Sequence, residues 1–196
     1  IPLGRTFDND TVKKYRVPAG VREIANSAFS GSDFKEIDFP SSVRTIGNFA
    51  FSHSALKRLE LPSSVESIGE NAFSECTNLE SADVGGAVKI GASAFSNDSA
   101  LKTVDLHPEL NRLKEIGAFA FFYSGLEKVK TPDSLATIGE RAFCANHSLL
   151  EIRLGSGLAN IEEMALADTP KLRSIEVAEG NPVFSDDSRK MLYAKR

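Results

Sequence analysis

VREIANSAF, residues 21–29, is the stretch that decides the fold, because the rest of the chain keeps returning to it. Its pattern recurs in VRTIGNFAF (43–51), VESIGENAF (65–73), AVKIGASAF (87–95), LKEIGAFAF (113–121), LATIGERAF (135–143) and, in degraded form, LANIEEMAL (158–166). The Ile of each segment lies 22, 22, 22, 26, 22 and 23 residues after the previous one. A nearly fixed step over most of a chain indicates a solenoid, in which each repeat forms one coil and stacks on its neighbours.

A second segment recurs between these stretches and predicts one short strand per coil. Its copies are VKKYRVPAG (12–20), FKEIDFPSS (34–42), LKRLELPSS (56–64), LESADVGGA (79–87), LKTVDLHPE (101–109), LEKVKTPDS (126–134), LLEIRLGSG (149–157) and LRSIEVAEG (172–180). Each reads apolar-x-x-apolar-x-apolar and ends in a breaker. The alternation of Ile37, Asp38 and Phe39 predicts a strand with one buried face.

The repeats of VREIANSAF also carry apolar residues at helical spacing, but two facts oppose a full helix. Gly follows the Ile in five of the repeats, and Gly inside a helix costs about 1 kcal/mol relative to Ala. A step of 22 residues also cannot hold the two helices that units of 33–34 residues contain. We therefore expect an extended piece, a turn at Gly, and one 3₁₀ or helical turn that carries Ala-Phe. Stacking would then place the Phe side chains in one continuous ladder.

The rhythm breaks at three places. Residues 1–11 show no periodicity and predict an irregular N-terminal segment, so the solenoid spans 12–178. The 26-residue step comes from extra residues around HPELNR (107–112), which should form a surface loop after the strand. Residues 179–196 depart from the main unit and predict either a hairpin-like cap or the start of a variant repeat that is cut off. We favour the second.

The repeat unit V-x-x-I-G-x-x-A-F-x-x-x-x-x-L-x-x-I-x-L-P-x-S resembles the BspA-like leucine-rich repeat. The closing NPVFSDDSRKMLY (181–193) is similar to that family's variant segment, although SRKML replaces its usual D-G-V-L-like string. The resemblance implies an α/β-type, right-handed superhelix of about seven coils of 22–26 residues. It also implies a concave parallel β-sheet, with short strands and 3₁₀ or helical turns on the convex side. The family is found mostly in secreted or surface proteins, and members with a discussed role act as adhesins that bind host matrix proteins such as fibronectin or fibrinogen.

Composition and motifs argue against several other functions. A net charge of −4 offers no general attraction for nucleic acid or anionic membranes, and no apolar run approaches the roughly 18 residues of a membrane span. No motif typical of an enzyme, a cofactor site or a metal site is present, so we expect none of these. Cys76 and Cys144 lie three coils apart, too far for a disulfide, and predict two free thiols. His53, His107 and His147 fall in loops without a common register and predict surface or turn residues.

The outward-facing strand position carries the charges that vary from coil to coil. Stacking places its central members in one row: Asp38, Glu60, Asp83, Asp105, Lys130 and Arg153, flanked by Arg16 and Glu176. Carboxylates about 5 Å apart on neighbouring strands repel one another unless a partner offsets them. The row is either a recognition stripe for a basic peptide or a cation, or a solvated face partly neutralised by Arg58 and Lys35.

Two functions remain open at this point. One is a non-enzymatic protein-binding module of a secreted or cell-surface protein, which would use the six central residues of the row to bind a host matrix protein or another surface protein. The other is a structural spacer in a longer repeat protein, with no ligand of its own. Glycan binding is weakened by the absence of Trp.

Overall fold

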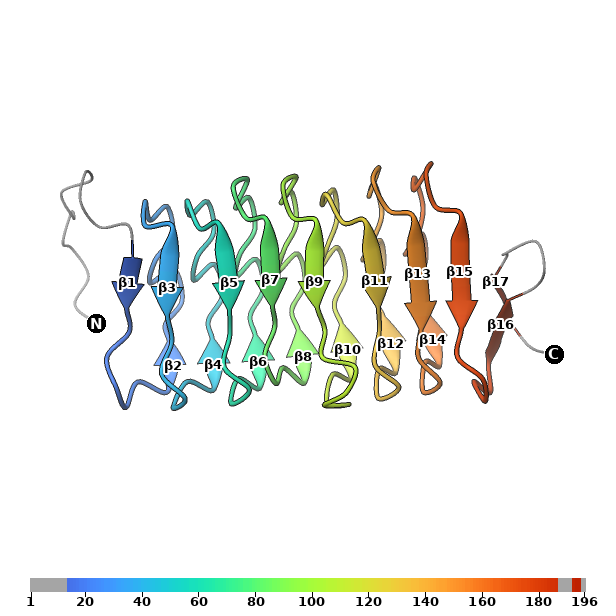
Figure 1. Ribbon diagram of the computed structural model, residues 1–196, viewed down its shortest axis with the longest axis horizontal. Coiled ribbons are helices and arrows are strands. Elements are labelled where there is room, and N and C mark those ends of the chain that lie inside the picture. Colours follow the sequence, from blue (N-terminus) through green and yellow to red (C-terminus); the bar gives the residue numbers. More distant parts are fainter. Residues whose placement is uncertain (1–13, 187–191, 195–196) are drawn as a thin grey trace.

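The computed structural model describes residues 14–186 and 192–194, and the main part of it is a single stack of coils (Figure 1). One strand of each coil has three or four residues: β1 (Lys14–Arg16), β3 (Glu36–Asp38), β5 (Arg58–Glu60), β7 (Ser81–Asp83), β9 (Thr103–Asp105), β11 (Lys128–Lys130), β13 (Glu151–Leu154) and β15 (Ser174–Val177). The other has two: β2 (Glu23–Ile24), β4 (Thr45–Ile46), β6 (Ser67–Ile68), β8 (Lys89–Ile90), β10 (Glu115–Ile116), β12 (Thr137–Ile138) and β14 (Asn160–Ile161).

The strands form parallel sheets along the stack. The longer strands β5 to β15 make a six-stranded sheet and the two-residue strands make a seven-stranded one, while β1 and β3 pair separately. In Figure 1 the longer strands lie in front and the two-residue strands behind. Register follows the repeat, since Ile46 is paired with Ile24 on one side and with Ile68 on the other. The predicted solenoid of about seven coils with a parallel sheet is confirmed.

The predicted 3₁₀ or helical turn is wrong, and with it the α/β assignment, because residues 14–186 and 192–194 contain no helix. The segment after each two-residue strand is a run of turns, with φ of +51° to +68° at two positions of every coil. These positions are Ser27, Phe49, Asn71, Ser93, Phe119, Arg141 and Met164, and Gly31, His53, Glu75, Asn97, Tyr123, Ala145 and Asp168. The backbone N–H groups of Ser27 and Phe29 donate to carbonyls of the next coil, at 2.9 Å and 2.7 Å. The N–H groups of Ala28 and Ser30, which alternate with these, bond to carbonyls three residues back within the coil. Bonds between coils thus replace every second bond that a helical turn would make within a coil.

The predicted Phe ladder fills the core. Six rings take part: Phe29, Phe51, Phe73, Phe95, Phe121 and Phe143. Successive ring centroids are 5.1–5.3 Å apart, with interplanar angles of 2–16°. Phe29 is slightly exposed, and the other five Phe residues are fully buried. Burial of each such ring contributes roughly 1.5–3 kcal/mol to folding, so the ladder is a main source of stability.

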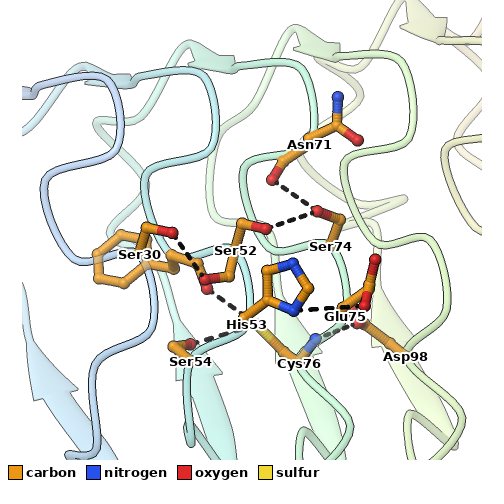
Figure 2. Close-up of polar contacts among 10 residues, drawn as sticks. Ser30, Ser52, His53, Ser54, Asn71, Ser74, Glu75, Cys76 and Asp98 are labelled. Carbon is orange, nitrogen blue, oxygen red and sulfur yellow. Dashed lines mark hydrogen bonds and ion pairs between the residues drawn. The ribbon is translucent and has the colours of Figure 1, made fainter.

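A row of small polar side chains and one Cys lies three residues after the Phe of each coil, and we call it the polar ladder. Figure 2 shows three of its members, Ser54, Cys76 and Asp98. In this ladder the Cys76 thiol lies 3.1 Å from the Phe51 carbonyl oxygen and 3.2 Å from Ser54 Oγ, and the Cys76 N–H donates to Asp98 Oδ1 at 2.8 Å. The prediction of two free thiols is confirmed, and both Cys76 and Cys144 are buried. Small polar side chains therefore satisfy backbone groups that would otherwise be unpaired inside the stack.

The two ends of the chain differ from the middle. The predicted irregular segment, residues 1–11, lies outside the described residues. At the other end β16 (Phe184–Asp186) pairs with β17 (Leu192–Ala194), and this pairing is antiparallel. Asn181 is buried and donates to the carbonyls of Gly155 and Leu158 at 3.1 Å and 2.9 Å, which ties the segment to the stack. The interpretation of 179–196 as a cut-off variant repeat stays a prediction.

Candidate functional site

The six predicted site residues lie in one row, one on each of the longer strands β3, β5, β7, β9, β11 and β13. Strand register pairs Glu60 with Asp83, Asp83 with Asp105, and Lys130 with Arg153. We call this set the charged row: Asp38, Glu60, Asp83, Asp105, Lys130 and Arg153. Because side chains alternate along a strand, the buried residues between the row positions, such as Leu59 and Ile152, point into the core instead.

The acidic part of the charged row lines a shallow open hollow of about 330 Å³. Its walls are the three strands Arg58–Glu60, Ser81–Asp83 and Thr103–Asp105. On the central strand, the small side chain of Ser81 lies on the same face as Asp83 and lines this hollow. The hollow therefore presents carboxylates to solvent across three neighbouring coils.

The basic part of the charged row lines a second hollow of about 350 Å³, over β9, β11, β13 and β15. Lys130 and Arg153 lie in it together with Lys128 and Glu151. Lys128 Nζ is 2.9 Å from Glu151 Oε2, so part of the charge in this hollow is already paired within the chain. The same sheet surface thus carries an acidic hollow beside a mixed, more basic one.

Asp38 on β3 is neutralised by two basic residues of the neighbouring strand β1. Lys14 Nζ lies 2.7 Å and Arg16 Nε 3.5 Å from the Asp38 carboxylate. The hydrogen bond from Lys14 is the main reason that the pKa of Asp38 is lowered. The expected neutralisation by Arg58 and Lys35 is not found, since neither forms an ion pair within the part of the chain that the structure describes. Within those residues Glu60, Lys130 and Arg153 also have no ion pair, so their charges face solvent.

His107 is the functional residue that the sequence did not reveal. The predicted loop is present as a turn over residues 108–110, after β9, but it brings the His107 ring back against the charged row. His107 Nε2 lies 2.6 Å from Asp83 Oδ1, and Nδ1 lies 2.7 Å from Glu109 Oε1 and 4.0 Å from Asp105 Oδ2. The ring is the partner that offsets the repulsion between Asp83 and Asp105.

The electrostatics of His107 follow from these contacts. Burial is the largest single influence and disfavours the charged imidazolium, but the hydrogen bonds to Glu109 and Asp83 and the nearby carboxylates outweigh it, so the pKa of His107 is raised. The bond to His107 in turn lowers the pKa of Glu109. The only signal for this arrangement in the sequence is the spacing Asp105-x-His107-x-Glu109 in the one repeat with an enlarged loop.

Comparison with known proteins gives a consistent picture of the fold. The chain resembles a leucine-rich repeat protein from Eubacterium ventriosum (TM-score 0.64, 25% identity, 71% of this chain and 36% of that one). It also resembles the pneumococcal vaccine antigen PcpA (TM-score 0.65, 24% identity, 94% and 44%) and a leucine-rich repeat protein of Treponema pallidum (TM-score 0.61, 27% identity, 87% and 70%). The chain thus spans less than half the length of the first two.

No curated protein sequence matches the chain. Nowhere in residues 14–186 and 192–194 does it form a helix with the length and hydropathy of a membrane span. The family model described as "BspA type Leucine rich repeat region (6 copies)" matches residues 4–115 and 86–188. Together these matches leave out only the first three and the last eight residues, and the chain belongs to the BspA-type leucine-rich-repeat family.

Proposed function

We propose that this chain is a non-enzymatic protein-binding module of a secreted or cell-surface protein and that it binds its partner through the charged row. The surface location and the adhesin-type role are what the family resemblance implies. The observation that carries the proposal is the pair of neighbouring open hollows on one sheet surface, one lined by Glu60, Asp83 and Asp105 and the other by Lys130 and Arg153.

The charges of the row favour a partner with a complementary pattern. Glu60, Lys130 and Arg153 have no ion pair within the described residues, so a partner can pair with them without first breaking a bond inside the chain. From β5 to β13 the row crosses four strand spacings, or roughly 19 Å. A segment of this length with basic residues opposite Glu60 and acidic residues opposite Arg153 would match it. Such complementarity contributes to orientation and association rate more than to raw affinity.

Charge reversal on the row tests the proposal. We choose Glu60→Lys with Lys130→Glu, because neither residue forms an ion pair within the described residues and the variant should fold as the parent does. Binding to immobilised fibronectin and fibrinogen is measured by biolayer interferometry at 50 mM and 300 mM salt. We expect the parent to bind at least one of them, more weakly at high salt, and the double variant to bind at least tenfold more weakly.

A matched control places the same two charge changes on the other sheet. Lys89 on β8 and Glu115 on β10 form an ion pair of 2.8 Å, and Lys89→Glu with Glu115→Lys preserves it in reverse. This control should bind as the parent does. Equal weakening in both double variants would remove the charged row as the binding surface. A parent that binds neither protein would favour the alternative of a structural spacer.

A further inference from the structure

The His107 ring is held between carboxylates on both of its edges. Only 20% of its side chain is exposed, and each ring nitrogen lies within 2.7 Å of a carboxylate oxygen, from Asp83 on one edge and Glu109 on the other. Ionised carboxylates accept hydrogen bonds and do not donate them. A neutral imidazole has one N–H and can donate to only one of the two carboxylates, so the other contact needs either a second proton on the ring or a cation in its place.

The Nδ1 edge gathers three metal-ligating atoms from one short segment. Asp105, His107 and Glu109 each offer one atom, and these atoms all lie within 4.8 Å of one another. Ligands of a tetrahedral Zn²⁺ lie about 2.0–2.2 Å from the ion, which places them roughly 3.3 Å apart. His107 Nδ1 is 2.7 Å from Glu109 Oε1 and 4.0 Å from Asp105 Oδ2, so the distances bracket this value. The Glu109 side chain is 63% exposed and has room to move by the remaining fraction of an ångström.

The Nε2 edge supplies a separate observation, because its partner comes from another coil. Asp83 lies 24 residues before His107 and accepts from Nε2 with the same oxygen that accepts the Gly85 N–H at 2.7 Å. A ligating His usually donates its second ring N–H to such a carboxylate, which fixes the tautomer and leaves the other nitrogen free for the metal. Asp105 is held similarly, since its Oδ1 accepts the His107 backbone N–H at 2.8 Å and Oδ2 is left for a ligand.

The other histidines show that this arrangement is not a general result of an acidic surface. His53 meets one carboxylate, Glu75, at 3.3 Å, and His147 meets one, Asp168, at 3.1 Å. Their side chains are 60% and 51% exposed. Only His107, among the described residues, has a carboxylate on each ring nitrogen and belongs to a group that could hold a metal ion.

We propose that Asp105 Oδ2, His107 Nδ1 and Glu109 Oε1 bind a divalent transition-metal ion, with Zn²⁺ as the best match, and that Asp83 positions the imidazole from behind. One nitrogen and two carboxylate oxygens suit Zn²⁺, whereas Mg²⁺ and Ca²⁺ prefer oxygen ligands alone. On binding, the ion takes the place of the Nδ1 proton, which is released to solvent. Three protein ligands leave the fourth position of a tetrahedral ion open to water or another ligand. The site does not rest on the protein-binding role proposed above.

Calorimetric titration with ZnCl₂ tests the site on chain that has been treated with EDTA and dialysed. We expect one equivalent of Zn²⁺ per chain, and at least tenfold weaker binding after His107→Ala or Glu109→Gln. Asp83→Asn should weaken binding about tenfold, as loss of a partner behind a ligating His does. The matched controls His53→Ala and His147→Ala should bind Zn²⁺ as the parent does. Because Glu109 is mostly exposed, Glu109→Gln gives a folded variant even where His107→Ala disturbs the turn.

Three results would overturn the site. These are the absence of saturable Zn²⁺ binding by the parent, an equal loss in His53→Ala and His107→Ala, and binding of MgCl₂ with the same affinity as ZnCl₂ and no effect of His107→Ala. The last result would reduce the cluster to diffuse attraction by carboxylates. The titration contains no protein ligand, so its failure leaves the protein-binding proposal standing, and a failure to bind matrix proteins leaves the metal site standing.

Discussion

Asp98 is a carboxylic acid at a repeat position where the neighbouring coils carry hydrogen-bond donors. Its equivalents Ser124 and Asn146 donate from their side chains to Phe carbonyls, Ser124 to Phe95 at 3.0 Å and Asn146 to Phe121 at 2.7 Å. An ionised carboxylate cannot donate, and Asp98 Oδ2 is buried without a partner (Figure 2 shows the residue beside Cys76). Burial is the main reason that the pKa of Asp98 is raised well above its ordinary value. The folded chain therefore holds this carboxyl as the neutral acid over a wider pH range than the unfolded chain does.

Asp98→Asn should stabilise the chain at neutral and alkaline pH. Because the folded pKa is raised, the contribution of Asp98 to stability is complete below its unfolded pKa of about 3.9 and is lost as the pH rises toward the folded value. Asn keeps the acceptor and adds the donor that Asn146 uses. We expect a gain of about 1–3 kcal/mol, the cost of a buried unsatisfied group. Urea denaturation at pH 5 and pH 8 measures it, and the gain should be larger at pH 8.

The reciprocal variant is the control for this effect. Asn146→Asp places a carboxylate in the same slot two coils further along and should lose stability as the pH rises. Equal free energies of unfolding for Asp98→Asn and the parent at pH 8 would contradict a buried neutral carboxyl at this position.

At the scale of the element, the Gly that follows the Ile in five of the coils lies in close contact with the preceding coil, whereas the last coil has Glu162 at this position. A Cβ on Gly91 would lie 2.6 Å from the Gly69 carbonyl carbon and 2.8 Å from the Glu70 nitrogen of the preceding coil. Real Cβ contacts do not approach backbone atoms this closely. The first coil among the described residues has Ala25 at this position, and its strand β2 lies at the edge of the seven-stranded sheet. The glycines thus mark close backbone contact, and they do not need the positive φ that glycine often supplies.

Gly91→Ala should destabilise the chain by about 1–3 kcal/mol, the usual cost of forcing an extra carbon into a packed interior. The neighbouring backbone must shift, because the clash involves main-chain atoms of Gly69 and Glu70, directly after β6. Thermal denaturation followed by circular dichroism measures the loss. The control is Gly31→Asn, since a Cβ at Gly31 meets nothing within 4 Å and Asn97 already adopts a φ of +62° at the same repeat position. A change at Gly31 as large as that at Gly91 would count against the close-contact explanation.

At the scale of the whole molecule, the chain is a one-dimensional stack in which each coil pairs with the coils beside it. Both main sheets run along the stack, as Figure 1 shows. The Phe rings follow the same direction, each stacked on the ring of the next coil. In such a structure stability is approximately a sum of coil and interface terms. A defect in the middle therefore weakens two interfaces, whereas a defect in the last coil weakens one.

Phe95→Ala, in the fourth coil, should lower the free energy of unfolding by about 3–5 kcal/mol. Phe95 stacks on Phe73 and Phe121 at 5.1 Å and 5.2 Å, so truncation removes both contacts and leaves a cavity. Leu166 holds the same position in the last coil and is half-buried. Leu166→Ala should cost less than half as much in the same urea titration. Equal losses would show that the stack does not behave as a sum of neighbouring interfaces.

Much of the architecture could be predicted because the same sequence pattern recurs in every coil. The Ile and Phe positions, the short strands and the row from Asp38 to Arg153 all follow from a period of about 22 residues and the alternation of side chains along a strand. The conformation of the turn segment could not be predicted, because the local spacing of apolar residues is the same for a helical turn and for the observed run of turns. What distinguishes the two is that N–H groups such as that of Ser27 bond to the next coil.

The sequence by itself determined the coil, the core ladder and the order of charges along the stack, since each of these depends on which residue occupies a repeated position. The tertiary structure alone decided which of those charges are paired. Lys14 on β1 pairs with Asp38 on the neighbouring strand β3. The enlarged turn after β9 places His107 against Asp83 in the preceding coil. The His107 contact depends on how the enlarged loop folds back over the neighbouring coil, a geometry that the repeat pattern does not encode.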